Sequence, residues 1–230
     1  MTNEIAAVRT SNTDIHSELE GIRGAMGFMN ENFEQFKKDV AGLRREVTEV
    51  KTQNSQCQYE IKQMQKALLE AKKEIIELKQ YSRSQNVEIK GIPVVPDENL
   101  RKSVEKMAAS VGVDVSEDDI DVVHRVRSKD KDRPNVVLRF STRAVRDKFF
   151  SAARKARLTT RILGFEECNP VYVNEHLCIE NKVLLSKARQ LRLEKKWKFA
   201  WVSQGKIFMR KTETSTVLRI ESDSDLAQIV

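Results

Sequence analysis

The 230-residue chain has little of the chemistry that marks enzymes and metal proteins. It contains three cysteines and three histidines, and the cysteines form no paired CxxC spacing. Cys168, Cys178 and His176 lie near one another in sequence, but without a second ligand cluster they do not predict a metal site. There is no phosphate-cradling glycine loop, nucleophile elbow or Cys–His arrangement. The sequence therefore favours a non-catalytic protein without a cofactor or a small-molecule substrate.

Long apolar runs are also missing from the chain. No stretch approaches the ~20 consecutive apolar residues of a membrane span, and the first residues do not form a secretory signal. The cysteines show no disulfide pattern, so reduced thiols are the default. We expect an intracellular protein without a membrane span, in the cytoplasm and/or the nucleus.

What the sequence does contain is a hydrophobic heptad repeat in one register from Ile5 to Leu78. So many heptads exceed what one face of a globular helix needs, and they predict a coiled coil that must assemble with other copies. The seam consists of the a positions Ile5, Asn12, Leu19, Met26, Phe33, Val40, Val47, Asn54, Ile61, Leu68 and Ile75, and of the d positions Val8, Ile15, Ile22, Met29, Phe36, Leu43, Val50, Cys57, Met64, Ala71 and Leu78.

Charges beside this seam predict the orientation of the helices. In a parallel coil each g residue faces the next e residue of the partner, and here acids meet bases at five such positions. An antiparallel coil would oppose like charges, so the pattern favours a parallel homo-oligomer. The number of chains stays open from the residues alone: Asn12 and Asn54 suit a dimer, whereas the branched d positions and two central phenylalanines suit a trimer. The five pairs are Glu4–Arg9, Glu18–Arg23, Asp39–Arg44, Glu46–Lys51 and Glu74–Lys79.

Positive charge is concentrated after the heptads. Residues 1–80 carry 12 Lys and Arg against 13 Asp and Glu, whereas residues 81–230 carry 29 against 21. The formal net charge of +7 therefore comes from the C-terminal part. An asymmetry of this kind indicates an anionic polymer or a membrane surface as partner.

The chain after residue 80 predicts an α+β fold in two domains. Residues 81–174 show the order β-α-β-β-α-β, a ferredoxin-like arrangement also used by RNA-recognition domains. The expected strands are 87–93, 120–126, 135–140 and 171–174. The expected helices are 97–111, capped by Asp97, and a helix to about residue 157 that is capped by Ser141 or Thr142. Residues 175–230 predict a basic C-terminal domain: a helix over 175–196 capped by Asn174, a hairpin over 198–211, a strand over 217–220, and a short helix capped by Ser222 or Asp223.

Two rows of cations on predicted helices indicate a nucleic-acid interface. Rows of Lys and Arg neutralise phosphates and release counterions, whereas solvated helix faces usually mix both signs. The loop 125–133 adds further cations, although two aspartates dilute it and a solvated loop is the alternative. The candidate nucleic-acid-binding residues are Arg125, Arg127, Lys129, Arg133, Arg143, Arg146, Arg154, Arg157, Lys182, Arg189, Arg192, Lys196, Lys206, Arg210 and Lys211.

Aromatic residues give a less definite signal. RNA-recognition domains stack bases on aromatics of their first and third strands, but the segments 87–91 and 135–140 offer only Phe140. Trp197, Phe199, Trp201 and Phe208 cluster around the C-terminal hairpin, where they favour a core position over a stacking platform. Tyr172 is ambiguous in the same way.

Taken in order, several motifs of residues 81–227 resemble the first-open-reading-frame proteins of LINE retrotransposons and the baculovirus few-polyhedra protein. The resemblance implies a parallel homotrimer that coats single-stranded RNA or DNA and acts as a nucleic-acid chaperone. It also implies backbone contacts by Arg125, Arg127, Arg133, Arg189 and Arg192. The motifs are NVEIKGIP at 86–93, DIDVVHRVR at 119–127, RPNVVLRF at 133–140, RDKFFSAARKAR at 146–157, VNEHL at 173–177 and FAWVSQGKIFMRK at 199–211.

Two functions remain in competition. The preferred hypothesis is a non-catalytic, oligomeric protein that binds single-stranded nucleic acid. The alternative is a coiled-coil structural or trafficking adaptor of the few-polyhedra type, whose basic domains bind acidic proteins. Steep salt dependence of single-strand binding would distinguish the first from the second.

Overall fold

The computed structural model describes residues 2–127 and 133–229, with side chains for Val8 and from Thr10 onward. The chain forms two compact units, residues 1–69 and 70–230, and each is described by itself. Helices and antiparallel strands are both present, as the sequence predicts. None of the helices in the described ranges is long and apolar enough to cross a membrane.

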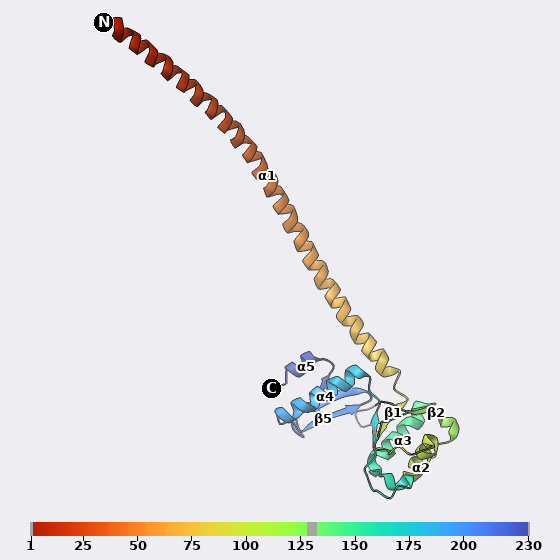
Figure 1. Ribbon diagram of the computed structural model, residues 1–230. Coiled ribbons are helices and arrows are strands. Elements are labelled where there is room, and N and C mark those ends of the chain that lie inside the picture. The colour runs from red at the N-terminus through yellow and green to blue at the C-terminus, as the bar shows by residue number, and fades with distance from the viewer. Residues whose placement is uncertain (1, 128–132, 230) are drawn as a thin grey trace. The chain divides into compact units, whose positions relative to one another are not determined.

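The heptad region is a single helix, α1, that runs from Thr2 to Tyr81 (Figure 1). The long N-terminal helix expected from the sequence is therefore confirmed. The large apolar seam side chains that the structure describes, from Val8 on, are between 48% and 72% exposed in the single chain, apart from the half-buried Val40. A helix with such a seam buries no core of its own. The helix ends in a turn in which the Ser82 amide donates to the Leu78 carbonyl oxygen.

Residues 86–175 form what we call the four-stranded module. Its elements are β1 (Asn86–Lys90), α2 (Leu100–Ser110), β2 (Ile120–Arg125), β3 (Val136–Phe140), α3 (Arg143–Ala156) and β4 (Tyr172–Glu175), with 3-10 turns at Glu117–Asp119 and Thr160–Leu163. All neighbouring strands are antiparallel, in the order β2-β3-β1-β4. The order of elements is thus β-α-β-β-α-β.

Alternation along the strands gives this sheet two different faces. Val87 and Ile89 of β1 are fully buried in one hydrophobic cluster with Met107 of α2 and Phe149 of α3. Successive side chains of a strand point to opposite faces, so Glu88 and the exposed Lys90 face away from the two helices. The helices therefore cover one face of the sheet, and polar residues of β1 lie on the other.

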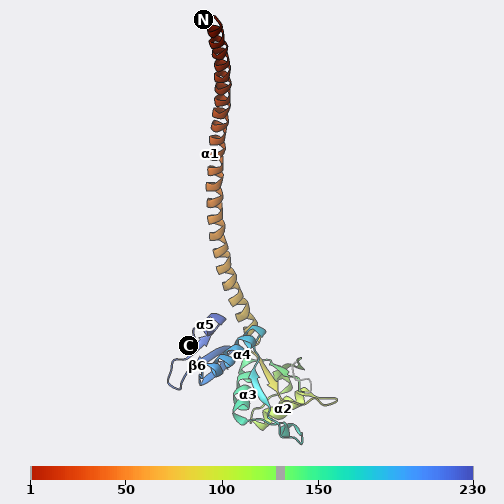
Figure 2. The ribbon, with the colours of Figure 1, turned by 60° about the vertical axis from the view of Figure 1, so that its left-hand side comes forward.

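Residues 176–229 form the three-stranded module. It consists of α4 (Ile179–Glu194), β5 (Phe199–Ser203), β6 (Lys206–Arg210), β7 (Leu218–Ile220) and α5 (Asp223–Ala227), with strand order β5-β6-β7. Figure 2 shows α4 beside β6 and α5. A second hydrophobic cluster, which includes Leu184, Ala188, Trp197 and Met209, holds these elements together. The two modules therefore have separate cores.

Two helix starts differ from the sequence-based expectations, and a third agrees with one of two expected caps. Helix α2 is capped by Asn99, whose side chain accepts from the Lys102 amide, and not by Asp97, which adopts a φ of 54°. Asn174 does not cap α4, because strand β4 continues through Glu175 and the helix begins at Ile179 after Cys178. Of the two candidates for α5, Ser222 is the cap.

Candidate nucleic-acid interface

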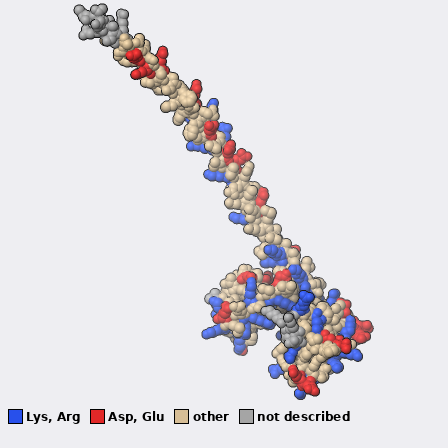
Figure 3. Space-filling view, in the orientation of Figure 1, with Lys and Arg blue, Asp and Glu red and all other residues tan. Residues whose placement is uncertain are grey.

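A cleft of about 520 Å³ lies between the two modules, and we call it the basic cleft. The four-stranded module supplies residues of β1, α3 and β4 to its lining, and the three-stranded module supplies residues of α4 and β5. Both modules belong to the unit 70–230. Figure 3 shows Lys and Arg side chains over α4 and the strands beside it. The cleft thus joins segments that are about a hundred residues apart in the chain.

Cations line both walls of the basic cleft. Lys90 and Arg154 come from the four-stranded module, and Lys182 and Arg189 come from α4. Within the described part of the chain, no ion pair is recorded for Lys90, Arg154 or Arg189. Arg154 lies over the Phe150 ring at 5.3 Å, which fixes its guanidinium while leaving the side chain exposed. These three charges are available for an anionic ligand.

Lys182 has a partner inside the protein. Its Nζ lies 3.0 Å and 3.1 Å from the two carboxylate oxygens of Glu88, which is only 3% exposed. The Asn135 amide also donates to this carboxylate at 2.7 Å. Burial on its own raises the pKa of Glu88, but the hydrogen bonds and charge of Lys182 together with Asn135 bring the pKa below its ordinary value. Lys182 therefore neutralises a buried acid that would otherwise repel a polyanion.

Two aromatic side chains add flat surfaces to the cleft. Tyr172 lies on the edge strand β4, is 58% exposed, and pairs in register with Lys90. Trp201 of β5 is half-buried and stacks on Phe208 of β6, with ring centroids 5.7 Å apart and an interplanar angle of 24°. Exposed rings beside cations are what proteins use to stack unpaired bases while holding the phosphates.

His176 lies at the junction of the two modules. Its Nδ1 accepts a hydrogen bond from the Asn86 side-chain amide at 3.1 Å, because the neutral ring can offer a lone pair there. Burial, and then the charge of Lys182, lowers the pKa of His176 to about 4. The imidazole is therefore neutral at physiological pH and joins β1 to the segment before α4 as a hydrogen-bond acceptor.

Two predicted phosphate ligands have structural roles instead. All five N–H groups of Arg125 are used inside the protein: two bind the Glu98 carboxylate and the others bind carbonyl oxygens of Ile92, Pro93 and Pro134. Arg146 is 8% exposed, donates to Asp147 and lies over the Phe150 ring. Neither guanidinium is left with the exposed donors that a phosphate contact needs.

The remaining predicted residues are spread over the surface. Arg133 lies 3.7 Å from Glu167, and Lys129 falls outside the described residues. Arg192 is half-buried and donates to the Lys198 carbonyl oxygen at 3.4 Å. Arg210 is half-buried with its guanidinium over the Phe199 ring at 4.8 Å. Arg127, Arg157, Lys196 and Lys211 of the predicted set are exposed and do not line the basic cleft.

A second hollow, of about 620 Å³, lies where the last turns of α1 meet both modules. Arg143 and Lys206 from the predicted set line it, and the Arg143 guanidinium lies 4.4 Å from the centre of the Tyr81 ring. Acidic side chains, among them Glu77 and Glu221, share the lining. Four of its lining residues are acidic, against two in the basic cleft, Glu88 and Glu175, so this hollow is a weaker match to a polyanion.

The basic cleft thus contains Arg154, Lys182 and Arg189 of the predicted set and adds three residues that the sequence analysis did not assign. Lys90 alternates with buried residues in β1, so the sequence could predict which face of the strand it occupies. The sequence could not predict which residues lie opposite Lys90 across the cleft. Tyr172 and Trp201 carried an ambiguous signal, and the structure leaves both partly exposed. Among the described residues, no group of three His, Cys, Asp or Glu side chains could hold a metal ion.

A comparison with known protein families gives a match to the C-terminal part of the chain. Residues 178–230 match the family model described as Baculovirus FP protein domain 2. The matched segment contains α4, β5 to β7 and α5, and with them Lys182, Arg189 and Trp201 of the basic cleft. It supports the few-polyhedra part of the resemblance over about a quarter of the chain. No curated protein matches the chain.

Proposed function

We propose that this protein is a non-catalytic oligomer that binds single-stranded RNA or DNA in the basic cleft. The observation that carries the proposal is the combination of three unpaired cations, Lys90, Arg154 and Arg189, with the exposed ring of Tyr172 and the half-buried ring of Trp201. Cations hold a phosphate backbone, and rings stack on bases. The order of elements in the four-stranded module, which RNA-recognition domains share, adds support.

The cleft favours a single strand over a duplex. Bases in a duplex are stacked and paired, so they cannot lie against Tyr172 or Trp201 without being pulled out. A cavity of about 520 Å³ is in the range of pockets for small molecules, which suits a few unpaired nucleotides. We infer that the cleft holds a short piece of a strand and that further nucleotides continue over the exposed cations.

Oligomerisation through α1 completes the proposal. The exposed apolar seam supports a coiled coil. The charges at the e and g positions favour parallel helices, and the resemblance to the LINE proteins favours three chains over two. Each chain of 26.5 kDa then adds one basic cleft to the assembly. Because the clefts are tethered, binding of one favours binding of the next on the same strand, as expected for a protein that coats nucleic acid as a chaperone.

The test is the affinity of the full-length protein for matched oligonucleotides at two salt concentrations, measured by fluorescence anisotropy. A single strand should bind with a logarithmic salt slope of about −2 to −3, from three or four contacts at about −0.7 each. A duplex of the same sequence should bind more weakly at each salt concentration. Affinity without salt dependence, or tighter binding of the duplex, would refute the proposal.

A second candidate function rests on the match of residues 178–230 to baculovirus FP protein domain 2. In this alternative the protein is a structural or trafficking adaptor whose basic surface binds acidic proteins. The same titration distinguishes the two functions when an acidic polypeptide of equal net charge is included. An adaptor would bind the polypeptide and show no preference for single strands.

A further inference from the structure

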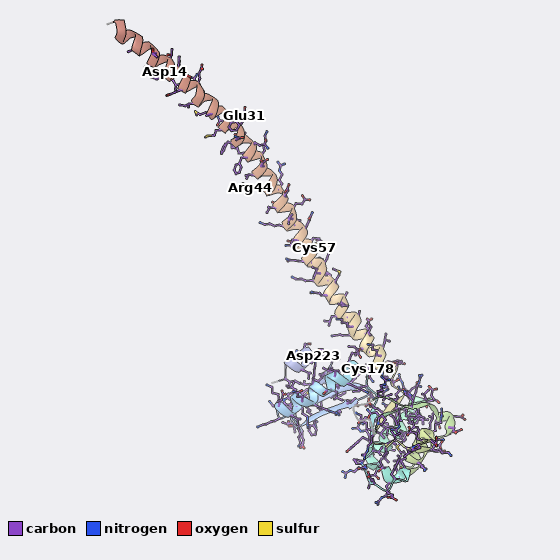
Figure 4. All side chains as sticks on the ribbon, in the orientation of Figure 1. Asp14, Glu31, Arg44, Cys57, Cys178 and Asp223 are labelled. Carbon is purple, nitrogen blue, oxygen red and sulfur yellow. The ribbon has the colours of Figure 1, made fainter. Side chains whose placement is uncertain are left out.

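The last turn of α1 is fastened to the three-stranded module by one side chain, that of Gln80. Its Nε2 donates to the His176 carbonyl oxygen at 3.1 Å. Its Oε1 accepts from the Cys178 backbone amide and from the Asn181 side-chain amide, both at 3.1 Å. Figure 4 shows Cys178 close to the C-terminal end of α1. One amide group therefore makes three hydrogen bonds to the start of α4.

These hydrogen bonds satisfy groups that α4 leaves open. Cys178 is the N-cap of α4, and its side chain makes no capping hydrogen bond. Its backbone amide belongs to the first turn, where donors have no partner within the helix. Gln80 supplies the missing acceptor from a different helix. Next to it, Lys79 pairs with Glu180 of the same turn at 2.5 Å.

The β5–β6 turn fits closely around the same side chain. A Cβ atom at Gly205 would lie 2.7 Å from Gln80 Cγ and 2.9 Å from its Nε2. Gly205 has a φ of 73°, and its amide and the Gln204 amide donate to the Glu175 carboxylate at the end of β4. Gln80 thus touches two separate segments of the three-stranded module, and only a glycine leaves room for it.

We propose that Gln80 is a positioning residue that sets the width of the basic cleft. The proposal rests on the proposed function, because it concerns the site where the strand would bind. Arg154 and Tyr172 belong to one wall, and Arg189 and Trp201 belong to the other. The two modules have separate hydrophobic cores and meet through polar contacts such as Lys182–Glu88. The Gln80 contacts fix the wall formed by the three-stranded module to α1, the helix that directly precedes β1 of the other wall.

The experiment measures the distance between the modules in the full-length protein. Spin labels are placed at the exposed native Cys168 and at Gln190→Cys on the outer surface of α4, in a Cys57→Ser background. Labelled chains are diluted with unlabelled chains, so that only distances within one chain are detected. Gln80→Ala is compared with Gln56→Ala, a glutamine of the same helix whose amide contacts only Glu60.

Gln80→Ala should broaden the distance distribution, and Gln56→Ala should leave it unchanged. Gly205→Ala should reproduce the broadening, because its methyl group displaces Gln80 without changing α1. Gln80→Glu keeps the acceptor but loses the donor to His176, so it should give an intermediate distribution. Melting temperatures of all variants verify that the modules remain folded.

Binding provides the second readout. The affinity for a short single strand should fall about 3- to 10-fold in Gln80→Ala and Gly205→Ala, because a smaller fraction of molecules has the binding geometry. The salt slope should not change, since no cation is removed. If Gln80→Ala and Gly205→Ala stayed folded and gave distance distributions as narrow as that of Gln56→Ala, the positioning role of Gln80 would be overturned. If the wild-type protein bound no strand, the proposed function would fail. The distance distributions alone would then decide whether Gln80 positions the two modules.

Discussion

Helix α1 and the unit formed by residues 70–230 use apolar side chains in opposite ways. Most large seam residues of α1 are half or more exposed, whereas the two modules bury two clusters with residues such as Phe149 and Met209 at 0% exposure. A seam without a cover favours assembly with other helices, and a closed core does not. The comparison suggests a division of work, in which α1 sets the number of clefts and the modules make each cleft.

Removal of residues 1–69 separates these roles and should have the largest effect. The fragment 70–230 keeps both hydrophobic clusters and Gln80, so we expect a folded monomer. Its affinity for a long single strand should fall by about 10²–10⁴-fold, because later contacts are no longer tethered. Its affinity for a short strand should change little. Light scattering gives the mass, and a fragment that bound long strands as tightly as the full chain would contradict the division of work.

Substitution of Lys182 tests how far the stability of the unit 70–230 depends on the ion pair with the buried Glu88 carboxylate. Lys182→Met leaves the Glu88 carboxylate buried without its cation and should lower the free energy of unfolding by about 1–3 kcal/mol. The pKa of Glu88 is lowered in the folded protein, so the ionised carboxylate stabilises the folded unit at pH values above its ordinary pKa. This stabilisation is lost as the pH falls through the lowered pKa. The variant should therefore lose this pH dependence in thermal melts. Lys187→Met is the matched control, since its partner Asp223 is exposed.

Substitutions of the unpaired cations should affect binding but not folding. Arg154→Ala and Arg189→Ala should each weaken single-strand binding about tenfold, the loss of ~1.4 kcal/mol expected for one charged contact. The salt slope should become shallower by about 0.7 for each lost contact. Lys155→Ala removes an equal, exposed charge beside Arg154 and should have little effect. Equal losses in all three variants would indicate a diffuse charge effect rather than a cleft.

A further prediction concerns the pH dependence of stability. The pKa of His176 is about 4 in the folded protein, below its ordinary value of 6.5, so the unfolded chain takes up the proton first. His176 therefore stabilises the fold above pH 6.5, and this contribution is lost as the pH falls from 6.5 to 4. In His176→Gln the melting temperature should decline less over that range. A parallel decline in both proteins would contradict the assignment.

Local patterns predicted most of the fold. The heptads predicted α1, and alternation with turn residues predicted the strands in their order along the chain. The predicted start of α4 was wrong because Glu175 stays extended and its carboxylate accepts from the Gln204 and Gly205 amides. This contact joins segments that are distant in the sequence. Periodicity describes one segment at a time and cannot report such a contact.

The candidate site was predicted less well than the fold. Charge counts found Arg154, Lys182 and Arg189, but they also selected Arg125, whose donors are all used inside the protein. A sequence gives the number of cations in a segment, whereas their availability depends on carbonyl and carboxylate partners from other segments. The walls of the basic cleft come from both modules, so for the same reason the cleft could not be predicted from the sequence.

Photo-cross-linking of a bound strand tests the central claim most directly. A single-stranded oligonucleotide with photoreactive bases is cross-linked to the full-length protein, and the modified peptides are identified by mass spectrometry. Bases that stack in the basic cleft should cross-link to peptides containing Tyr172 and Trp201, and Arg154→Ala combined with Arg189→Ala should reduce both. Cross-links confined to α1 or to α2, unaffected by these substitutions, would contradict the account.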